Sequence, residues 1–150
     1  NIANPYFSLR IFIDIFSRKV TGWAMDTRIR DSLVLSALNQ AIGREHPEKG
    51  LIVHTDRGSQ YSSQRFQALL NRYGCVQSMS RKGNCLDNAV IENFFGLLKS
   101  ELFYLQEFKS MEHFKQKRID YLDYYNNRRI KAKLKGLPPA IHRQQALSAA

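Results

Sequence analysis

Two carboxylates stand out because of the residues that surround them. Asp56 ends the apolar run LIVHT (51–55) and is followed by the turn-forming pair Arg57-Gly58. Glu92 lies in LDNAVIENFFGLLKSE (86–101), and 35 residues (57–91) separate it from Asp56. Mg²⁺ prefers oxygen ligands, so two carboxylates brought together by folding would suit a divalent cation. Each also has an ordinary explanation, Asp56 as a turn residue and Glu92 as a solvated helix residue.

Other catalytic chemistries have less support in this sequence. Cys75 and Cys85 have no partners at metal-ligand spacing, so we do not expect zinc, and they are typical of reduced thiols. We find no Ser/His/Asp arrangement, and we interpret His54 as a strand residue beside Asp56 and not as a base.

Hydrophobic periodicity predicts the strands that would position these residues. SLRIFIDIFSRK (8–19) alternates with period two as far as Phe16, and VTGWAMD (20–26) follows a polar turn at 17–19, which predicts a hairpin. LIVHT indicates a short buried central strand, and CVQSMS (75–80) indicates another. Asp56 therefore falls at the carboxyl end of a strand, where ligands gather in open α/β sheets.

Helical rhythm and capping residues predict five helices. The first is capped by Asp31 or Ser32, and the second runs from Ser62 or Ser63 to Gly74. A long helix begins at Asp87 and reaches about residue 104, and two more begin at Ser110 and at 138–139. The order of elements predicts one α/β domain, residues 1–150, with a mixed sheet flanked by helices.

On a helical wheel Glu92 faces away from the expected core stripe, which consists of Val90, Phe94, Leu97 and Leu105. Lys99 lies within about 20° of the direction of Glu92. Gly96 suggests close approach of a backbone or a ligand, since glycine inside a helix costs about 1 kcal/mol relative to alanine. Asp87 points elsewhere and is expected to be an N-cap, and Glu101 lies near the core stripe without an assigned role.

The net charge of +10 is concentrated at the C-terminal end. Residues 124–150 form a basic helical tail that contains no acid and carries Arg128, Arg129, Lys131, Lys133, Lys135 and Arg143. Such a patch favours a polyanion, most simply DNA, although a solvated basic surface is the plain alternative. No stretch is long and apolar enough to predict a membrane span.

Three segments in order, HTDRGSQY, GNCLDNAVIENFFGLLKSE and YNNRRIKAKLKGLPPA, resemble the integrase core of bacterial insertion-sequence transposases. These enzymes form the D-D-35-E group and are related to retroviral integrases. The resemblance covers about residues 6–143. It implies a ribonuclease-H-like fold and a site in which acidic side chains hold two Mg²⁺ (or Mn²⁺) ions for DNA strand cleavage and strand transfer.

The resemblance also assigns roles to individual residues. Asp56 and Glu92 become catalytic metal ligands, Lys99 becomes a contact to a DNA phosphate, and Gln60, Tyr61 and Asn88 support the site. We expect the tail to contact DNA through Arg128, Arg129, Lys131 and Lys133. The implied partners are insertion-sequence ends, target DNA and further copies of the protein, in the bacterial cytoplasm.

The sequence departs from the family pattern at one catalytic position. The family has a third carboxylate on its opening strand, which the resemblance places before Asn1. We therefore expect these residues to lack the first strand and to be impaired in catalysis on their own. We expect Asp14 to be half-buried and hydrogen-bonded rather than a substitute metal ligand.

Two alternative functions remain open. A non-catalytic DNA-binding remnant with a ribonuclease-H-like fold would explain the missing carboxylate and the basic tail. A nuclease of the resolvase or ribonuclease-H type would cut without joining, but the segment DNAVIENFFGLLK (87–99) argues against it.

Overall fold

A computed structural model of the chain describes residues 8–28, 30–81, 88–103 and 107–149. The chain divides into two compact units, each described here by itself. Unit 1 contains Ile13–Val20 and Val90–Ala150, and unit 2 contains Tyr6–Phe12 and Thr21–Ala89. The elements in chain order are β1 Ser8–Ile13, β2 Val20–Asp26, α1 Asp31–Glu45, β3 Ile52–Thr55, α2 Ser59–Ser62, α3 Gln64–Tyr73, β4 Val76–Met79, α4 Ala89–Leu98, the π-helical turn Lys99–Phe103, α5 Met111–Asn127, the 3₁₀ turn Ala132–Leu134 and α6 Pro139–Ala149.

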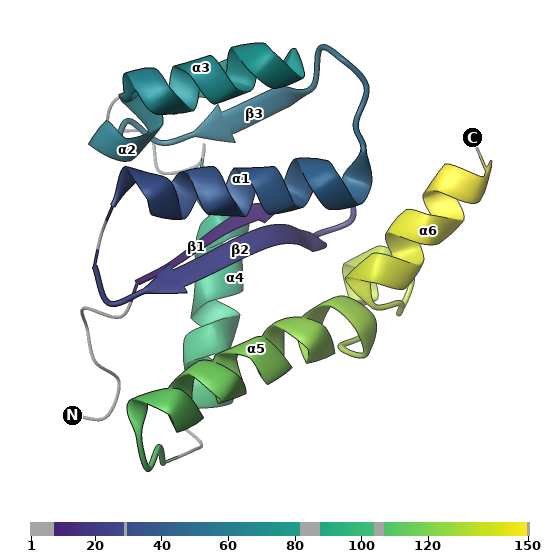
Figure 1. Cartoon of the computed structure of the whole chain (residues 1–150). Coiled ribbons are helices and arrows are strands. Elements are labelled where there is room, and N and C mark those ends of the chain that lie inside the picture. The colour runs from purple at the N-terminus through teal and green to yellow at the C-terminus, as the bar shows by residue number, and fades with distance from the viewer. Residues whose placement is uncertain (1–7, 29, 82–87, 104–106, 150) are drawn as a thin grey trace. The chain divides into compact units, whose positions relative to one another are not determined.

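Unit 2 is built around strand β3, against which α1 and α3 pack (Figure 1). Strands β3 and β4 are parallel, with Ile52 opposite Val76 and Thr55 opposite Met79. The core of this unit consists of Val34, Leu38, Val53, Phe66 and Leu70. This is the predicted α/β arrangement, although the described strands form two pairs, β1 with β2 and β3 with β4, instead of one sheet.

Several predicted helix ends are confirmed. Ser63 caps α3 by accepting a hydrogen bond from the backbone N–H of Phe66 at 3.2 Å, and Gly74 ends the helix with φ 69°. Ser110 caps α5 by accepting from the N–H of His113 at 3.0 Å. The predicted cap of α1 is wrong, because Arg30 occupies the N-cap position and makes no side-chain capping bond.

Two strand predictions are corrected by the structure. β1 ends at Ile13, and Ile15 and Phe16 lie in the following turn with 71% and 62% of their surface exposed. The carboxylate of Asp14 accepts hydrogen bonds from the N–H groups of the next residues, which favours a turn over a continued strand. β3 is buried on one face only, since Val53 is 6% exposed while Ile52 is 66% exposed.

Unit 1 has an aromatic core between α4 and α5. The ring of Phe94 meets that of Tyr125 edge to face, with centroids 5.0 Å apart. Leu98, at 1% exposure, takes the core position that was predicted for Leu97. The predicted core residue Phe94 is confirmed, so the error is confined to Leu97; Leu105 and the predicted cap Asp87 lie outside the described residues. Other buried members of this core are Leu102, Phe114, Tyr121 and Leu122.

An ion pair joins the π-helical turn to the segment after α5. The guanidinium of Arg129 donates to both carboxylate oxygens of Glu101, from Nε to Oε1 at 2.8 Å and from Nη2 to Oε2 at 2.6 Å. The hydroxyl of Tyr121 donates to Oε1 at 2.7 Å. The hydrogen bonds from Arg129 lower the pKa of Glu101, and burial only partly opposes them. Glu101, which had no role in the sequence analysis, therefore fixes Arg129.

In the part of the chain that the structure describes, none of the helices combines the length and apolar character needed to span a bilayer.

We expect Glu101→Gln to destabilise the protein near neutral pH and to flatten the loss of stability in acid. The pKa of Glu101 is lowered in the folded state, so its charge adds stability above its unfolded pKa of about 4.3. That contribution disappears as the pH falls through the lower folded pKa. Loss of this charge-assisted pair should reduce the free energy of unfolding by about 1–3 kcal/mol near pH 7, measured by urea denaturation.

Glu112→Gln is the matched control, because Glu112 is an exposed residue in the first turn of α5. It should lose stability in acid as the unmodified protein does. Equal pH dependence of Glu101→Gln and the unmodified protein would contradict the role given to the ion pair.

Candidate functional site

Asp56 lies immediately after β3, at the predicted carboxyl end of that strand. Its side chain is exposed and turns back over the next residues, where Oδ1 accepts a hydrogen bond from the N–H of Gly58 at 2.7 Å. A Cβ at Gly58 would lie 2.9 Å from Oδ1, so a larger residue there would require a small shift of the carboxylate. Among the hydrogen bonds of the described residues, Asp56 uses Oδ1 alone, which leaves Oδ2 for a cation.

A hydrogen-bond network beside Asp56 was missed by the sequence analysis. His54 contacts two hydroxyl groups, Ser78 through Nδ1 and Ser80 through Nε2, both at 3.1 Å. The hydroxyl of Ser80 donates to Oδ1 of Asn88 at 2.7 Å. Arg57 donates from Nε to the carbonyl of Ser80 at 2.8 Å. Two features of the sequence could have indicated this network. Ser78 and Ser80 lie two residues apart and therefore on one face of their strand, and His54 lies on another strand that could pair with it.

The network places Asn88, one of the predicted supporting residues, at the end of a chain of contacts that starts on β3. Gln60 and Tyr61 lie in α2, within the same unit. Oε1 of Gln60 accepts from Nε of Arg10 at 3.2 Å, and the ring of Tyr61 packs edge to face on Phe66. Burial raises the pKa of Tyr61, so its hydroxyl stays protonated. All three predicted supporting residues thus have partners within unit 2.

Glu92 lies in the first turn of α4 and is exposed, as the helical wheel predicted. Lys99 is also exposed, but it begins the π-helical turn, where straight α-helix geometry no longer fixes its direction. Gly96 lies between them; among the described residues no heavy atom comes within 4 Å of a Cβ built there. The expected close backbone approach is therefore not found.

Asp56 belongs to unit 2 and Glu92 to unit 1, so their joint binding of one cation stays a prediction. Within residues 8–28, 30–81, 88–103 and 107–149, no three His, Cys, Asp or Glu side chains form a cluster that could hold a metal ion.

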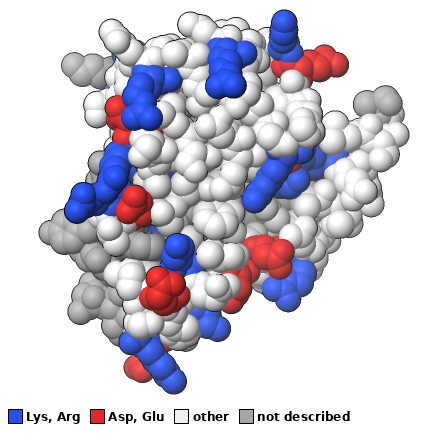
Figure 2. Space-filling model, viewed as in Figure 1, with Lys and Arg blue, Asp and Glu red and all other residues white. Residues whose placement is uncertain are grey.

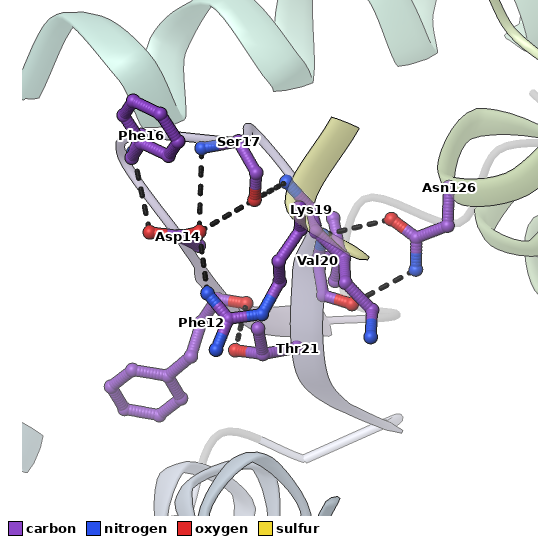
Figure 3. Close-up of polar contacts among 9 residues, drawn as sticks. Phe12, Asp14, Phe16, Ser17, Lys19, Val20, Thr21 and Asn126 are labelled. Carbon is purple, nitrogen blue, oxygen red and sulfur yellow. Dashed lines mark hydrogen bonds and ion pairs between the residues drawn. The ribbon is translucent and has the colours of Figure 1, made fainter. Parts of the chain in front are cut away.

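Asp14 has the structural role that was expected of it (Figure 3). Its Oδ2 accepts from the hydroxyl of Ser17 at 2.5 Å and from Nη1 of Arg143 on α6 at 2.7 Å. Burial disfavours the charged form, but the hydrogen bonds from Ser17 and Phe16 and the charge of Arg143 outweigh it and lower the pKa of Asp14. The carboxylate is thus committed to holding the turn after β1.

The cations of the basic tail differ in their exposure and in their partners. The guanidinium of Arg128 lies 5.6 Å from the ring centroid of Tyr124, and its side chain is 66% exposed. Lys133 is exposed, whereas Arg129 is held by Glu101 with a side chain only 18% exposed. Figure 2 shows Lys and Arg side chains spread over one face with acidic side chains among them. The predicted DNA contacts remain predictions, and Arg129 has a structural partner that the sequence analysis did not anticipate.

Comparison with known proteins identifies the family to which the chain is related. The family model for the integrase core domain matches residues 2–85, and a second integrase core model matches residues 92–147. The transposase for insertion sequence element IS904 of Lactococcus lactis is 48% identical over 123 residues, which cover 81% of this chain and 49% of that protein. The InsF transposase of insertion sequence IS3A from Escherichia coli is 41% identical over 132 residues, covering 87% and 46%. The chain thus spans about half the length of these relatives.

Solved structures show the same fold at low sequence identity. The catalytic core domain of BIV integrase matches with a TM-score of 0.72 and 19% identity, covering 94% of this chain and 88% of that one. The HTLV-2 integrase catalytic core domain, solved in complex with magnesium, matches with a TM-score of 0.69 and 20% identity, covering 93% and 86%. The predicted ribonuclease-H-like fold is confirmed, and the chain belongs to the integrase core domain family.

Proposed function

We propose that this chain is the catalytic core of a DNA transposase, which cuts DNA strands at the ends of an insertion sequence and joins them to target DNA. The observation that carries the proposal is the pair of integrase core matches, 2–85 and 92–147, which include both Asp56 and Glu92. The transposases of IS904 and IS3A, at 48% and 41% identity, support it.

Asp56 and Glu92 would bind Mg²⁺ or Mn²⁺. Both carboxylates are exposed, and one oxygen of Asp56 is oriented by the N–H of Gly58. Oxygen ligands of this kind suit Mg²⁺, which keeps several waters and needs few protein ligands. The related HTLV-2 integrase core was solved with magnesium, which supports the same choice of metal here.

A pair of bound metal ions would stabilise the attacking and leaving oxygens of an in-line displacement at phosphorus. The protein's own part is to orient the two carboxylates and the DNA. The bond from Gly58 holds Asp56, and the contacts of His54 and Ser80 hold Asn88 one residue before α4, the helix that carries Glu92. Lys99, exposed beyond the end of the same helix, would contact a DNA phosphate.

A non-catalytic DNA-binding remnant is the second candidate. It would need only the net charge of +10 and the exposed tail cations Arg128 and Lys133, because DNA binding alone requires no metal. We also propose that the protein works in the bacterial cytoplasm and that it forms a homo-oligomer. The HTLV-2 integrase cores were solved in dimeric and trimeric forms, which supports the second of these proposals.

We expect Asp56→Asn and Glu92→Gln each to weaken Mn²⁺ binding about tenfold or more and to remove whatever metal-dependent strand transfer the chain retains. Each change keeps the size of the side chain but removes a charged oxygen ligand. Electron paramagnetic resonance can measure Mn²⁺ affinity, and a labelled insertion-sequence end can report strand transfer. Unchanged Mn²⁺ affinity in both variants would rule out the metal site and leave the non-catalytic candidate.

Asp120→Asn is the matched control, since Asp120 is an exposed carboxylate on α5 that accepts a hydrogen bond from Gln116. It should bind Mn²⁺ as the unmodified protein does. The prediction that residues 1–150 alone are impaired in strand transfer can be tested in the same assay, where efficient joining by these residues would contradict it.

We expect joint neutralisation of Arg128, Lys131 and Lys133 to weaken DNA binding and to reduce its salt dependence. Each lost phosphate contact lowers the slope of log K against log salt by about 0.9, so the triple change should lower it by about two to three. Arg129 is left intact because it stabilises Glu101. Fluorescence anisotropy with duplex DNA across a salt series measures the slope, and an unchanged slope would exclude these tail residues from DNA binding.

A further inference from the structure

The turn between β1 and β2 holds a cation in an unusual backbone conformation. Arg18 has φ 66°, in the left-handed region that residues other than glycine rarely adopt. Its N–H donates to the carbonyl of Asp14 at 2.7 Å, and the N–H of Asp14 donates to the carbonyl of Lys19 at 2.8 Å. The same Asp14 is held by Ser17 and Arg143, so the turn is fixed from several sides.

A side-chain amide attaches this turn to the end of α5. Asn126 accepts at Oδ1 from the N–H of Val20 at 2.8 Å and donates from Nδ2 to the carbonyl of Val20 at 2.9 Å (Figure 3). Asn126 thus pairs with both the N–H and the carbonyl of Val20, as the backbone of a neighbouring strand would. They connect positions 106 residues apart and so bring the turn at Arg18 next to the start of the basic tail.

Positive charges converge where these two segments meet. The ammonium group of Lys131 lies 5.7 Å from the ring centroid of Tyr125. Burial lowers the pKa of Lys131, and the charges of Arg129, Arg18 and Lys133 lower it further. Glu101 acts in the opposite direction, but its carboxylate is already held by Arg129. Arg18, two residues before Val20, and Lys131 and Lys133, which follow α5, therefore form a cluster whose mutual repulsion Glu101 offsets only in part.

We propose that Arg18, Lys131 and Lys133 form one phosphate-binding cluster for the DNA backbone, in which Arg18 of the hairpin turn is the member outside the tail. The inference rests on the proposed function, because it names where unit 1 contacts DNA. A phosphodiester chain would relieve the repulsion among the three cations and release its own counterions.

The test is the salt dependence of binding to a duplex DNA of arbitrary sequence, measured by fluorescence anisotropy between about 50 and 200 mM NaCl. Arg18→Asn removes the charge, and asparagine tolerates the left-handed conformation. The slope of log K against log salt should fall by about 0.9, as expected for the loss of one phosphate contact. Arg18→Lys keeps the charge and should keep the slope.

Arg72→Gln is the matched control, since it removes one charge from an exposed position in the last turn of α3. It should leave the slope unchanged; an equal fall in Arg72→Gln and Arg18→Asn would show an effect of net charge alone and overturn the inference. Arg18→Gly, also compatible with the left-handed conformation, replaces Arg18→Asn if circular dichroism shows that the latter is unfolded.

The outcomes separate this inference from the proposed function. If Arg18→Asn keeps the full slope while neutralisation of Arg128, Lys131 and Lys133 reduces it, Arg18 does not contact DNA and the proposed function stands. If the unmodified protein shows no salt-dependent DNA binding, both fail.

Discussion

The parallel pairing of β3 with β4 is the constraint on which the chemistry of unit 2 depends. Because the two strands run in the same direction, their carboxyl ends lie at one edge, and the residues that follow them are brought together. Asp56 and Arg57 follow β3, and Ser80 follows β4. Arg57 donates to the carbonyl of Ser80 across this edge, while the N–H of Gly58 orients the exposed Asp56 carboxylate.

Unit 1 uses its charged residues in two distinct ways. Arg129 and Arg143 are engaged by Glu101 and Asp14, and both pairs connect segments far apart in the sequence. Arg128 and Lys133 remain exposed after the end of α5. A basic tail that looks uniform in the sequence is thus divided between cations that hold the fold together and cations that can reach a polyanion.

Local signals predicted most of the elements, and the errors have both local and distant causes. Ser63, Gly74 and Ser110 were recognisable because a cap acts within four residues of itself. The early end of β1 depends on the side chain of Asp14, whose turn-forming bonds compete with a period-two pattern that continues to Phe16. The pairing of Glu101 with Arg129 spans 28 positions, and no local pattern announces it. The exposed position of Glu92 was predicted, whereas the network beside Asp56 depends on the pairing of β3 with β4, which the sequence allows but does not specify.

The place of His54 between two serines has a consequence for its ring. The hydroxyl of Ser80 has one hydrogen and three possible acceptors within reach, Oδ1 of Asn88, the carbonyl of Thr55 and Nε2 of His54. When that hydrogen points to Asn88 or Thr55, a lone pair of the hydroxyl faces the ring and Nε2 of His54 is the donor; when it points to the ring, Nε2 is the acceptor. Either way the imidazole on β3 contacts the hydroxyls of Ser78 on β4 and of Ser80 just after it, so the two strands are joined through side chains as well as through their backbones.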